Sequence, residues 1–178
     1  MTVFISGGAK SGKSTLAQDL TVALSQGGKR YYVATLVSTG AEDDERIRRH
    51  IADRDGMGFE TVECRQNVMS VADPNGTFLV DSVTALIQNS LFPVKKNYEM
   101  DLEAASVCAD QLVEFAKTVR HAVFVSDYIY SDAEAFSEST QMYRKCLADI
   151  DRRLATVCDT VVEVAAGQPI VYKGELRI

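Results

Sequence analysis

Eight residues near the amino terminus have the types and spacing needed to hold a polyphosphate. The pattern G-x-x-x-x-G-K-S/T is fitted by Gly7-Gly8-Ala9-Lys10-Ser11-Gly12-Lys13-Ser14, between a short apolar segment and an amphipathic one. Glycines let successive main-chain N–H groups point inward, and the amino end of the following helix adds positive potential. We expect Lys13 to reach the β and γ phosphates and the Ser14 hydroxyl to bind Mg²⁺, with the loop extending to Thr15. The pattern predicts a phosphate-binding loop rather than a glycine-rich turn that only caps a helix.

A carboxylate follows a second apolar segment, in Thr77-Phe78-Leu79-Val80-Asp81. An acidic residue at the end of a neighbouring buried strand is the usual second protein ligand of Mg²⁺ on a bound triphosphate. Aspartate is also favoured as the N-cap of a helix, and a helical pattern begins directly afterwards. Asp81 is therefore predicted to bind the metal, directly or through water, with a capping role as the compatible alternative.

A histidine lies between two arginines at helical spacing. Arg46, His50 and Arg54 recur every fourth residue, which places them on one face of a helix. Neutral imidazole is a nucleophile, so His50 is a candidate for covalent catalysis. The plainer alternative is a solvated helix with salt-bridged arginines and an incidental histidine, and spacing alone favours that alternative. The other histidine, His121, has no motif around it and is predicted to be structural.

These candidates are positioned by alternating apolar and helical segments. The expected strands are Val3 to Ser6, Arg30 to Thr35, Glu60 to Cys64, Thr77 to Val80, Ala122 to Ser126 and Thr160 to Ala165. The expected helices are Ser14 to Ser25, Asp43 to Asp53, Ser82 to Leu91, Asp101 to Val119 and Ser139 to Val157. The tail from Gln168 to Ile178 predicts a β-hairpin turning at Lys173-Gly174, and candidate loops run from Phe92 to Met100 and from Tyr128 to Glu138.

The alternation predicts an α/β fold of the P-loop (RecA-like) type, with a mostly parallel sheet flanked by helices and a C-terminal hairpin. The 178 residues fit one nucleotide-binding domain, 1–178. A net charge of −6 argues against a general nucleic-acid binder, and no apolar run is long enough for a membrane span. The amino terminus carries no secretory pattern, so we expect a cytoplasmic protein, with its four scattered cysteines reduced and mostly packing residues.

Taken together, these motifs resemble one family, the adenosylcobinamide kinase/adenosylcobinamide-phosphate guanylyltransferase of cobalamin biosynthesis. The resemblance runs over nearly the whole chain, and the element R-I-x-x-H-x-x-x-R from Arg46 to Arg54 is its most specific part. Its further marks are the phosphate-binding loop, Tyr32-Val33-Ala34-Thr35, Phe59-Glu60-Thr61-Val62-Glu63, Val80-Asp81-Ser82-Val83-Thr84 with Asn89, and Val164-Ala165-Ala166-Gly167-Gln168-Pro169.

The resemblance implies two reactions on one corrinoid substrate, using Mg²⁺ with GTP, ATP or both. A triphosphate first phosphorylates adenosylcobinamide; GTP then donates GMP to a histidine, from which it passes to the substrate phosphate. His50 matches the guanylylated histidine, which reverses the preference from spacing, and Arg54 would hold its phosphate. Beyond the loop, the implied nucleotide contacts are Ala34, Thr35, Leu36, Ile51, Ala52, Asp53, Arg54, Glu63 and Asp81. The family also implies a homo-oligomer, with a trimer as its known form.

The chain departs from the family pattern after the fifth strand. Where the family commonly has V-S-N-E-V-G-x-G-I-V-P, this chain has Val125-Ser126-Asp127-Tyr128-Ile129-Tyr130-Ser131. Later, Tyr143-Arg144 and Asp151-Arg152 replace a phenylalanine-arginine and an asparagine-glutamine pair. Two alternatives therefore stay open: a P-loop small-molecule kinase without guanylyltransferase activity, and a nucleotide sensor without turnover.

Overall fold

Seven strands form one sheet in the order β3-β2-β4-β5-β1-β6-β7. The computed structural model describes residues 1–38, 40–130 and 134–176. The strands are β1 (Thr2–Gly7), β2 (Arg30–Ala34), β3 (Phe59–Glu63), β4 (Thr77–Asp81), β5 (His121–Asp127), β6 (Thr160–Ala165) and β7 (Gln168–Lys173). The first six pair in parallel, and β7 is antiparallel to β6. The predicted mostly parallel α/β sheet is confirmed.

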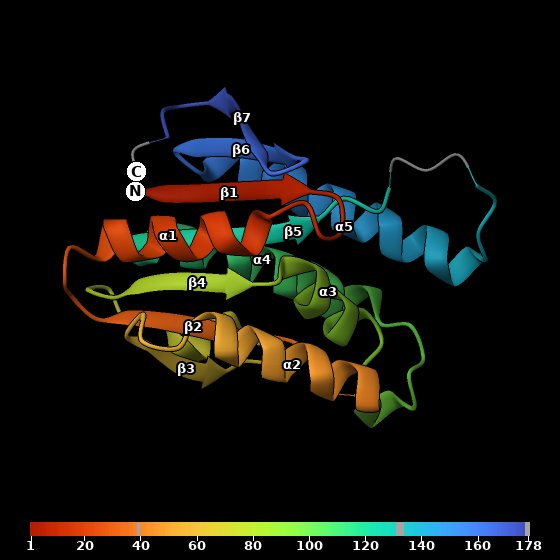
Figure 1. Cartoon of the computed structure of the whole chain (residues 1–178). Helices are drawn as coiled ribbons and strands as arrows, with labels where there is room; N and C mark the ends of the chain where they lie inside the picture. Colours follow the sequence, from red (N-terminus) through yellow and green to blue (C-terminus); the bar gives the residue numbers. More distant parts are fainter. Residues whose placement is uncertain (39, 131–133, 177–178) are drawn as a thin grey trace.

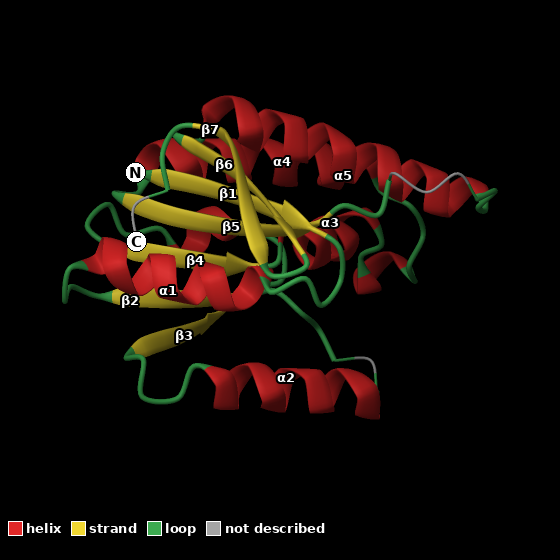
Figure 2. Cartoon of the chain, turned by 45° about the horizontal axis from the view of Figure 1, so that its top comes forward, coloured by secondary structure: helices red, strands yellow, loops and turns green. Residues whose placement is uncertain are grey.

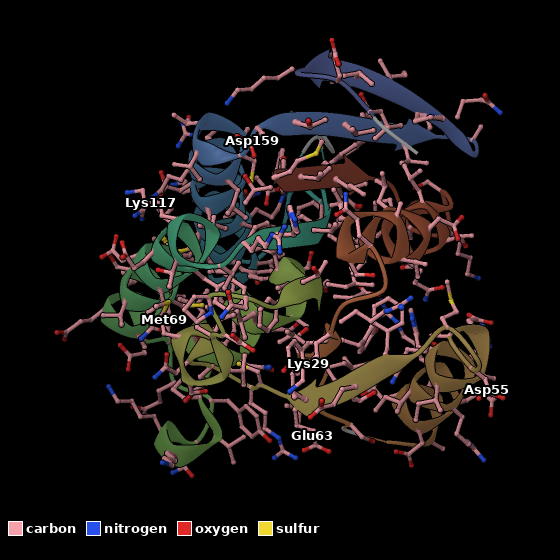
Figure 3. The ribbon with its side chains drawn as sticks, turned by 90° about the vertical axis from the view of Figure 1, so that its left-hand side faces the viewer. Lys29, Asp55, Glu63, Met69, Lys117 and Asp159 are labelled. Carbon is pink, nitrogen blue, oxygen red and sulfur yellow. The ribbon has the colours of Figure 1, made fainter. Side chains whose placement is uncertain are left out.

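Helices cover both faces of this sheet (Figure 1). They are α1 (Lys13–Ser25), α2 (Ala41–Asp53), α3 (Val83–Leu91), α4 (Leu102–Thr118) and α5 (Glu138–Val157), with short 3₁₀ turns η1 (Val68–Val71) and η2 (Val94–Lys96). Figure 3 looks along the strands and shows α1 and α2 on one side of the sheet and α3, α4 and α5 on the other. Each expected helix is present within about two residues of its predicted bounds, and η2 lies inside the expected loop from Phe92 to Met100.

The core has two layers because successive side chains of a strand point to opposite faces. Val3 and Ile5 of β1 pack with the α1 side, whereas Phe4 packs with α3, α4 and α5. The central strands are therefore near-continuous apolar runs, as a sheet buried on both faces requires. Helix α2 is different, because every one of its residues keeps part of its surface exposed. It stands over the β2–β3 edge of the sheet (Figure 2).

The C-terminal hairpin is present, but its predicted turn is wrong. The turn lies at Ala166-Gly167, where both residues have left-handed backbones with φ of 50° and 79°, and Ala165 pairs with Gln168. A two-residue turn with positive φ at both positions matches the twist of paired strands, so the chain reverses directly after β6. Gly174 is also left-handed, but it follows β7 instead of joining two strands. Residues 177–178 of the predicted hairpin, and 131–133 of the predicted loop before α5, lie outside the described residues.

Candidate functional site

The phosphate-binding loop connects β1 to α1 at the carboxyl edge of the sheet. Gly7 ends β1, and a Cβ atom placed on it would lie 2.5 Å from the carbonyl oxygen of Val164, so a larger residue would displace the neighbouring strand. Gly12 precedes α1 with φ of 97°, in the left-handed region that favours glycine. The N–H of Gly167 donates a 2.9 Å hydrogen bond to the carbonyl of Ser11. The β6–β7 turn therefore braces the loop.

Lys13 turns back over this loop. Its Nζ atom donates to the carbonyl oxygen of Gly8 at 2.6 Å and lies 2.8 Å from Oδ1 of Asp127, while its side chain is 6% exposed. The Oγ atom of Ser11 is buried and finds no hydrogen-bond partner among the described residues. A buried ammonium and an orphaned hydroxyl inside a glycine-rich turn suit an anionic ligand with several oxygens.

His50 faces the sheet instead of solvent. Its Nδ1 atom lies 3.7 Å from Oδ2 of Asp81, and its side chain is 23% exposed. The same Asp81 oxygen accepts a 3.2 Å hydrogen bond from the hydroxyl of Tyr32. Burial, followed by the charge of Asp81, raises the pKa of Tyr32, so this phenol stays protonated and keeps donating. The imidazole, the carboxylate and the phenol form one group beneath α2.

Arg54 lies on the same face of the chain but does not project into open space. Its guanidinium stacks over the Tyr32 ring at 3.9 Å from the centroid, and the residue is 7% exposed. It donates to Oγ1 of Thr61 at 3.2 Å and to the carbonyl oxygen of His50. These contacts fasten the end of α2 to β2 and β3. The spacing correctly grouped Arg54 with His50, but the guanidinium is already engaged with protein groups.

A cavity of about 340 Å³ joins these residues at the carboxyl ends of β2, β3 and β4. Of the predicted site residues, its lining includes Ala34, Thr35, Leu36, His50, Ile51, Arg54, Glu63 and Asp81. Ala52 and Asp53 are exposed on α2, and both lie outside this lining. The lining also includes Arg46 and Asp127, whereas the loop residues Gly7 to Thr15 lie outside it. The Asp127–Lys13 ion pair links the wall of the cavity to the phosphate-binding loop.

The strand ends beneath the cavity are held by a reciprocal pair of hydrogen bonds. Oγ1 of Thr35 donates to the carbonyl of Ser82 at 2.9 Å and accepts from the N–H of Ser82 at 2.7 Å. The Thr35 hydroxyl is fully buried and serves the fold. The alternative role of Asp81 as an N-cap is wrong, because Ser82 caps α3: its Oγ accepts from the N–H of Ala85 at 3.2 Å. The Asp81 carboxylate is thereby left facing the cavity.

Two further residues belong to the site although sequence reasoning did not select them. Tyr32 belongs to one of the family motifs, and its link to Asp81 arises from the pairing of β2 with β4. Asp127 ends β5, so the signal that selected Asp81, a carboxylate closing an apolar strand, was also available for it. The remaining histidine, His121, begins β5 and contacts the amino group of Met1 at 3.0 Å, remote from the cavity lining.

The residues present fit a Mg²⁺ ion bound chiefly through a nucleotide. Ser14 lies in the first turn of α1 and Asp81 at the end of β4, which supplies one hydroxyl and one carboxylate oxygen donor, the ligand types Mg²⁺ prefers. Within residues 1–38, 40–130 and 134–176, no cluster of three or more His, Cys, Asp or Glu could hold a metal by itself. Such a donor set requires the phosphates to complete the coordination shell.

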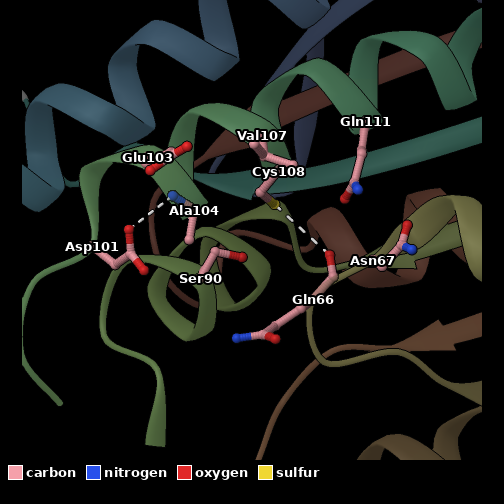
Figure 4. A pocket seen from close by; sticks show the side chains of 9 residues that line it. All are labelled: Gln66, Asn67, Ser90, Asp101, Glu103, Ala104, Val107, Cys108 and Gln111. Atoms are coloured by element: carbon pink, nitrogen blue, oxygen red, sulfur yellow. Dashed lines mark hydrogen bonds between the residues drawn. The ribbon is translucent and has the colours of Figure 1, made fainter. Parts of the chain in front are cut away.

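A second cavity, of about 350 Å³, lies between η1, α3 and α4 (Figure 4). Its wall includes Cys108, whose thiol pKa burial raises to about 11, and Asp101, which caps α4. All four cysteines of the chain are free thiols, as expected. Within the described part of the chain, every helix is too short or too polar to span a bilayer.

Solved structures resemble this fold at low sequence identity. The ATPase domain of G40P superposes with a TM-score of 0.51 at 10% identity, covering 97% of this chain and 76% of that domain. An ATPase from the type III secretion system of pathogenic bacteria superposes with a TM-score of 0.55 at 12% identity, covering 91% of this chain and 50% of that chain. The flagellar accessory protein FlaH from Methanocaldococcus jannaschii superposes with a TM-score of 0.50 at 16% identity, covering 98% of this chain and 78% of that chain. At such identities the likeness shows the fold alone, a mostly parallel α/β sheet flanked by helices.

Sequence comparison identifies the family. No curated protein matches the chain significantly. The model of one family, described as cobinamide kinase / cobinamide phosphate guanyltransferase, matches residues 3–172. That span includes the phosphate-binding loop, His50, Asp81 and the β6–β7 turn. The chain therefore belongs to the cobinamide kinase / cobinamide phosphate guanyltransferase family of cobalamin biosynthesis.

Proposed function

We propose that this chain uses the phosphate-binding loop and the His50 cavity as two parts of one nucleotide site, and that both family reactions take place there. The observation that carries the proposal is the ion pair that links them. Asp127 lines the cavity that contains His50 and also pairs with Lys13 of the loop at 2.8 Å. A triphosphate lying along this path would keep its β and γ phosphates in the loop and bring its α phosphate toward the imidazole.

In the first reaction, the hydroxyl of adenosylcobinamide attacks the γ phosphorus of GTP or ATP. The oxygen–phosphorus bond to the acceptor forms as the bond between the γ phosphorus and the β–γ bridging oxygen breaks, and the nucleoside diphosphate leaves. Lys13 and the loop N–H groups hold the charge that develops on the leaving oxygen. Ser14 and Asp81 would hold Mg²⁺, which would supply further charge neutralisation there.

In the second reaction, His50 acts as the nucleophile toward the α phosphorus of GTP. Its Nδ1 faces Asp81, which leaves Nε2 for attack and places a carboxylate where the ring becomes positive. The nitrogen–phosphorus bond forms as pyrophosphate leaves with the electrons of the broken phosphorus–oxygen bond. The phosphate of the substrate then attacks the guanylyl phosphorus, the bond to His50 breaks, and adenosyl-GDP-cobinamide is formed.

The remaining cavity residues suit the nucleoside and its phosphate. Arg46 lines the cavity with its side chain exposed, whereas Arg54 is committed to Tyr32 and Thr61. We therefore assign Arg46 to the α phosphate and Arg54 to holding the end of α2 in place. Glu63 lies at the β3 edge with a side chain that is 79% exposed, and it can accept from a guanine or ribose edge.

The setting of these reactions follows the family. The whole chain acts as one domain, and its partners are the corrinoid and a nucleoside triphosphate. The enzyme works in the cytoplasm as a homo-oligomer, with the trimer as the expected form. The exposed apolar residues of β7, Ile170, Val171 and Tyr172, support such an assembly, because an uncovered edge strand readily pairs with another copy.

Labelling of His50 tests the proposal. The purified protein is incubated with Mg²⁺ and GTP labelled in its α phosphate, and the bound label is examined for acid lability and alkali stability. We expect stoichiometric label in the unaltered protein and none in His50→Ala. The matched control is His121→Ala, which removes the histidine outside the cavity and should keep the label. Phosphoryl transfer without any nucleotidyl protein would instead support a small-molecule kinase, and label in His50→Ala would show that another residue is the nucleophile.

A further inference from the structure

Tyr32, in the middle of β2, contacts two groups that in turn contact His50. Its hydroxyl donates a 3.2 Å hydrogen bond to Oδ2 of Asp81, the atom that lies 3.7 Å from Nδ1 of His50. The face of its ring carries the guanidinium of Arg54, 3.9 Å from the centroid, and Arg54 donates to the carbonyl oxygen of His50. One side chain therefore reaches the imidazole of His50 through Asp81 and its main chain through Arg54.

The Tyr32 side chain is itself held firmly. Its backbone is paired on both sides, with Thr61 of β3 and with Leu79 of β4. Its ring is 5% exposed and packs edge to face on Phe59, with the centroids 6.4 Å apart. Because burial and the charge of Asp81 raise the pKa of Tyr32, its hydroxyl stays protonated and remains a donor at neutral pH. A group fixed in this way can fix the groups that it contacts.

Helix α2, which carries His50, depends on such contacts for its position. Each residue of α2 keeps part of its surface exposed, whereas α1, α3, α4 and α5 each bury several residues. Arg54 is the C-cap residue of α2, is 7% exposed, and also donates to Oγ1 of Thr61 at 3.2 Å. A helix without a buried face gains little orientation from packing. The place of His50, four residues before Arg54, is therefore set by the contacts of Arg54 and of the imidazole itself.

We infer that Tyr32 is the positioning residue of the guanylylation step. Its hydroxyl holds the Asp81 carboxylate toward Nδ1 of His50, and its ring seats Arg54 at the end of α2. As Nε2 of His50 bonds to the α phosphorus, pyrophosphate leaves with the electrons of the broken phosphorus–oxygen bond and the imidazole ring becomes positive. A carboxylate that is already oriented stabilises this charge without reorganising. The inference rests on the proposed function and adds the group that aligns its nucleophile.

Two variants separate the two contacts of Tyr32. Tyr32→Phe removes the hydroxyl and keeps the ring beneath Arg54, whereas Tyr32→Leu removes both. The matched control is Tyr31→Phe. Tyr31 is the preceding residue of β2, packs on the opposite face of the sheet, and also donates its hydroxyl to a carboxylate, Oδ2 of Asp73 at 3.4 Å. Urea unfolding checks that each protein folds.

Label on His50 from α-labelled GTP with Mg²⁺ is followed in single turnovers over a range of GTP concentrations. In Tyr32→Phe the rate at saturating GTP should fall by about 10 to 10²-fold, the usual contribution of a hydrogen bond to a charged group. The half-saturating GTP concentration should stay within about threefold, because the hydroxyl does not contact the nucleotide. Tyr32→Leu should be slower again, and Tyr31→Phe should label at the normal rate. Transfer of a labelled γ phosphate to adenosylcobinamide should persist in Tyr32→Phe, since that reaction does not use His50.

A double variant tests whether the hydroxyl acts through Asp81. Tyr32→Phe combined with Asp81→Asn should label within about threefold of Asp81→Asn alone, because the carboxylate that the hydroxyl orients is already gone. A residue with a merely structural role would multiply the two losses instead. Multiplied losses therefore overturn the inference.

The other outcomes overturn the inference in recognisable ways. Labelling by Tyr32→Phe at the normal rate would make the hydroxyl dispensable and leave the proposed function intact. An equal loss of labelling and of γ-phosphate transfer would mean that Tyr32 supports the metal or nucleotide site in general. If the unaltered protein transfers γ phosphate but never labels His50, the histidine part of the proposed function fails, and the inference fails with it.

Discussion

The Nδ1 atom of His50 lies 3.7 Å from the Oδ2 atom of Asp81, although one residue comes from α2 and the other from the end of β4. The same oxygen accepts the hydroxyl of Tyr32, so the carboxylate is held before it meets the histidine. The 3.7 Å separation is longer than a hydrogen bond, and a small movement of α2 would close it. Closure on nucleotide binding would then align the ring for attack.

Replacing Asp81 by Asn should slow the guanylylation of His50 by about 10² to 10⁴-fold, because an amide neither fixes the ring nor stabilises its positive charge. Single-turnover labelling with GTP, quenched at a series of times, measures this rate. The loss should persist at saturating Mg²⁺ and GTP. Recovery at high Mg²⁺ would mean that Asp81 acts only as a metal ligand. Asp55→Asn, which changes a carboxylate on the exposed turn after α2, should label at the normal rate.

Replacing Gly7 by Ala should lower the free energy of unfolding by about 1 to 3 kcal/mol, the usual cost of overpacking. The added Cβ would lie 2.5 Å from the carbonyl oxygen of Val164, and backbone cannot move aside as easily as a flexible side chain. Urea unfolding measures the change. Gly8→Ala is the matched control, since in the described structure its Cβ would meet no atom within 4 Å. Equal stabilities for the two variants would contradict the close approach of β1 to β6.

The buried carboxyl of Asp151 should make stability depend on pH. Burial raises the pKa of Asp151 to about 7, the charge of Asp127 acts in the same direction, and hydrogen bonds from Ser126 and Tyr130 partly oppose them. The unfolded chain has an aspartate pKa of about 3.9, so the folded state binds more protons between pH 4 and 7. The protonated Asp151 carboxyl therefore contributes roughly 4 kcal/mol to the free energy of unfolding. This contribution is complete below pH 4 and is lost as the pH rises to about 7.

Asp151→Asn removes that titration, so its free energy of unfolding should vary less between pH 4 and 8 than that of the unaltered protein. Urea unfolding at a series of pH values gives both curves. Asp149→Asn, two residues earlier in α5 and 54% exposed, should follow the unaltered curve. Parallel curves for the unaltered protein and Asp151→Asn would show that Asp151 is ionised in the folded state throughout this range.

The sequence by itself determined the phosphate-binding loop and the alternation of strands and helices. Both are local: the loop is a contiguous pattern with its own strand and helix, and the strands are apolar because both faces of the sheet are covered. Asp81 was also selected, since a carboxylate that ends a buried strand is visible without knowing the neighbouring strands. A C-terminal hairpin was predicted as well, but with its turn at Lys173-Gly174; the tail forms a single strand, β7, and its pairing with β6 places the turn at Ala166-Gly167.

Only the tertiary structure decided which groups meet. The order β4-β5-β1 brings Asp127 to Lys13, and the pairing of β2 with β4 brings Tyr32 to Asp81. Helical spacing placed Arg54 with His50 but did not show that its guanidinium stacks on Tyr32. Periodicity specifies the face of an element on which a residue lies, whereas the partner opposite that face depends on strand order and crossovers. Those depend on the packing of the whole chain.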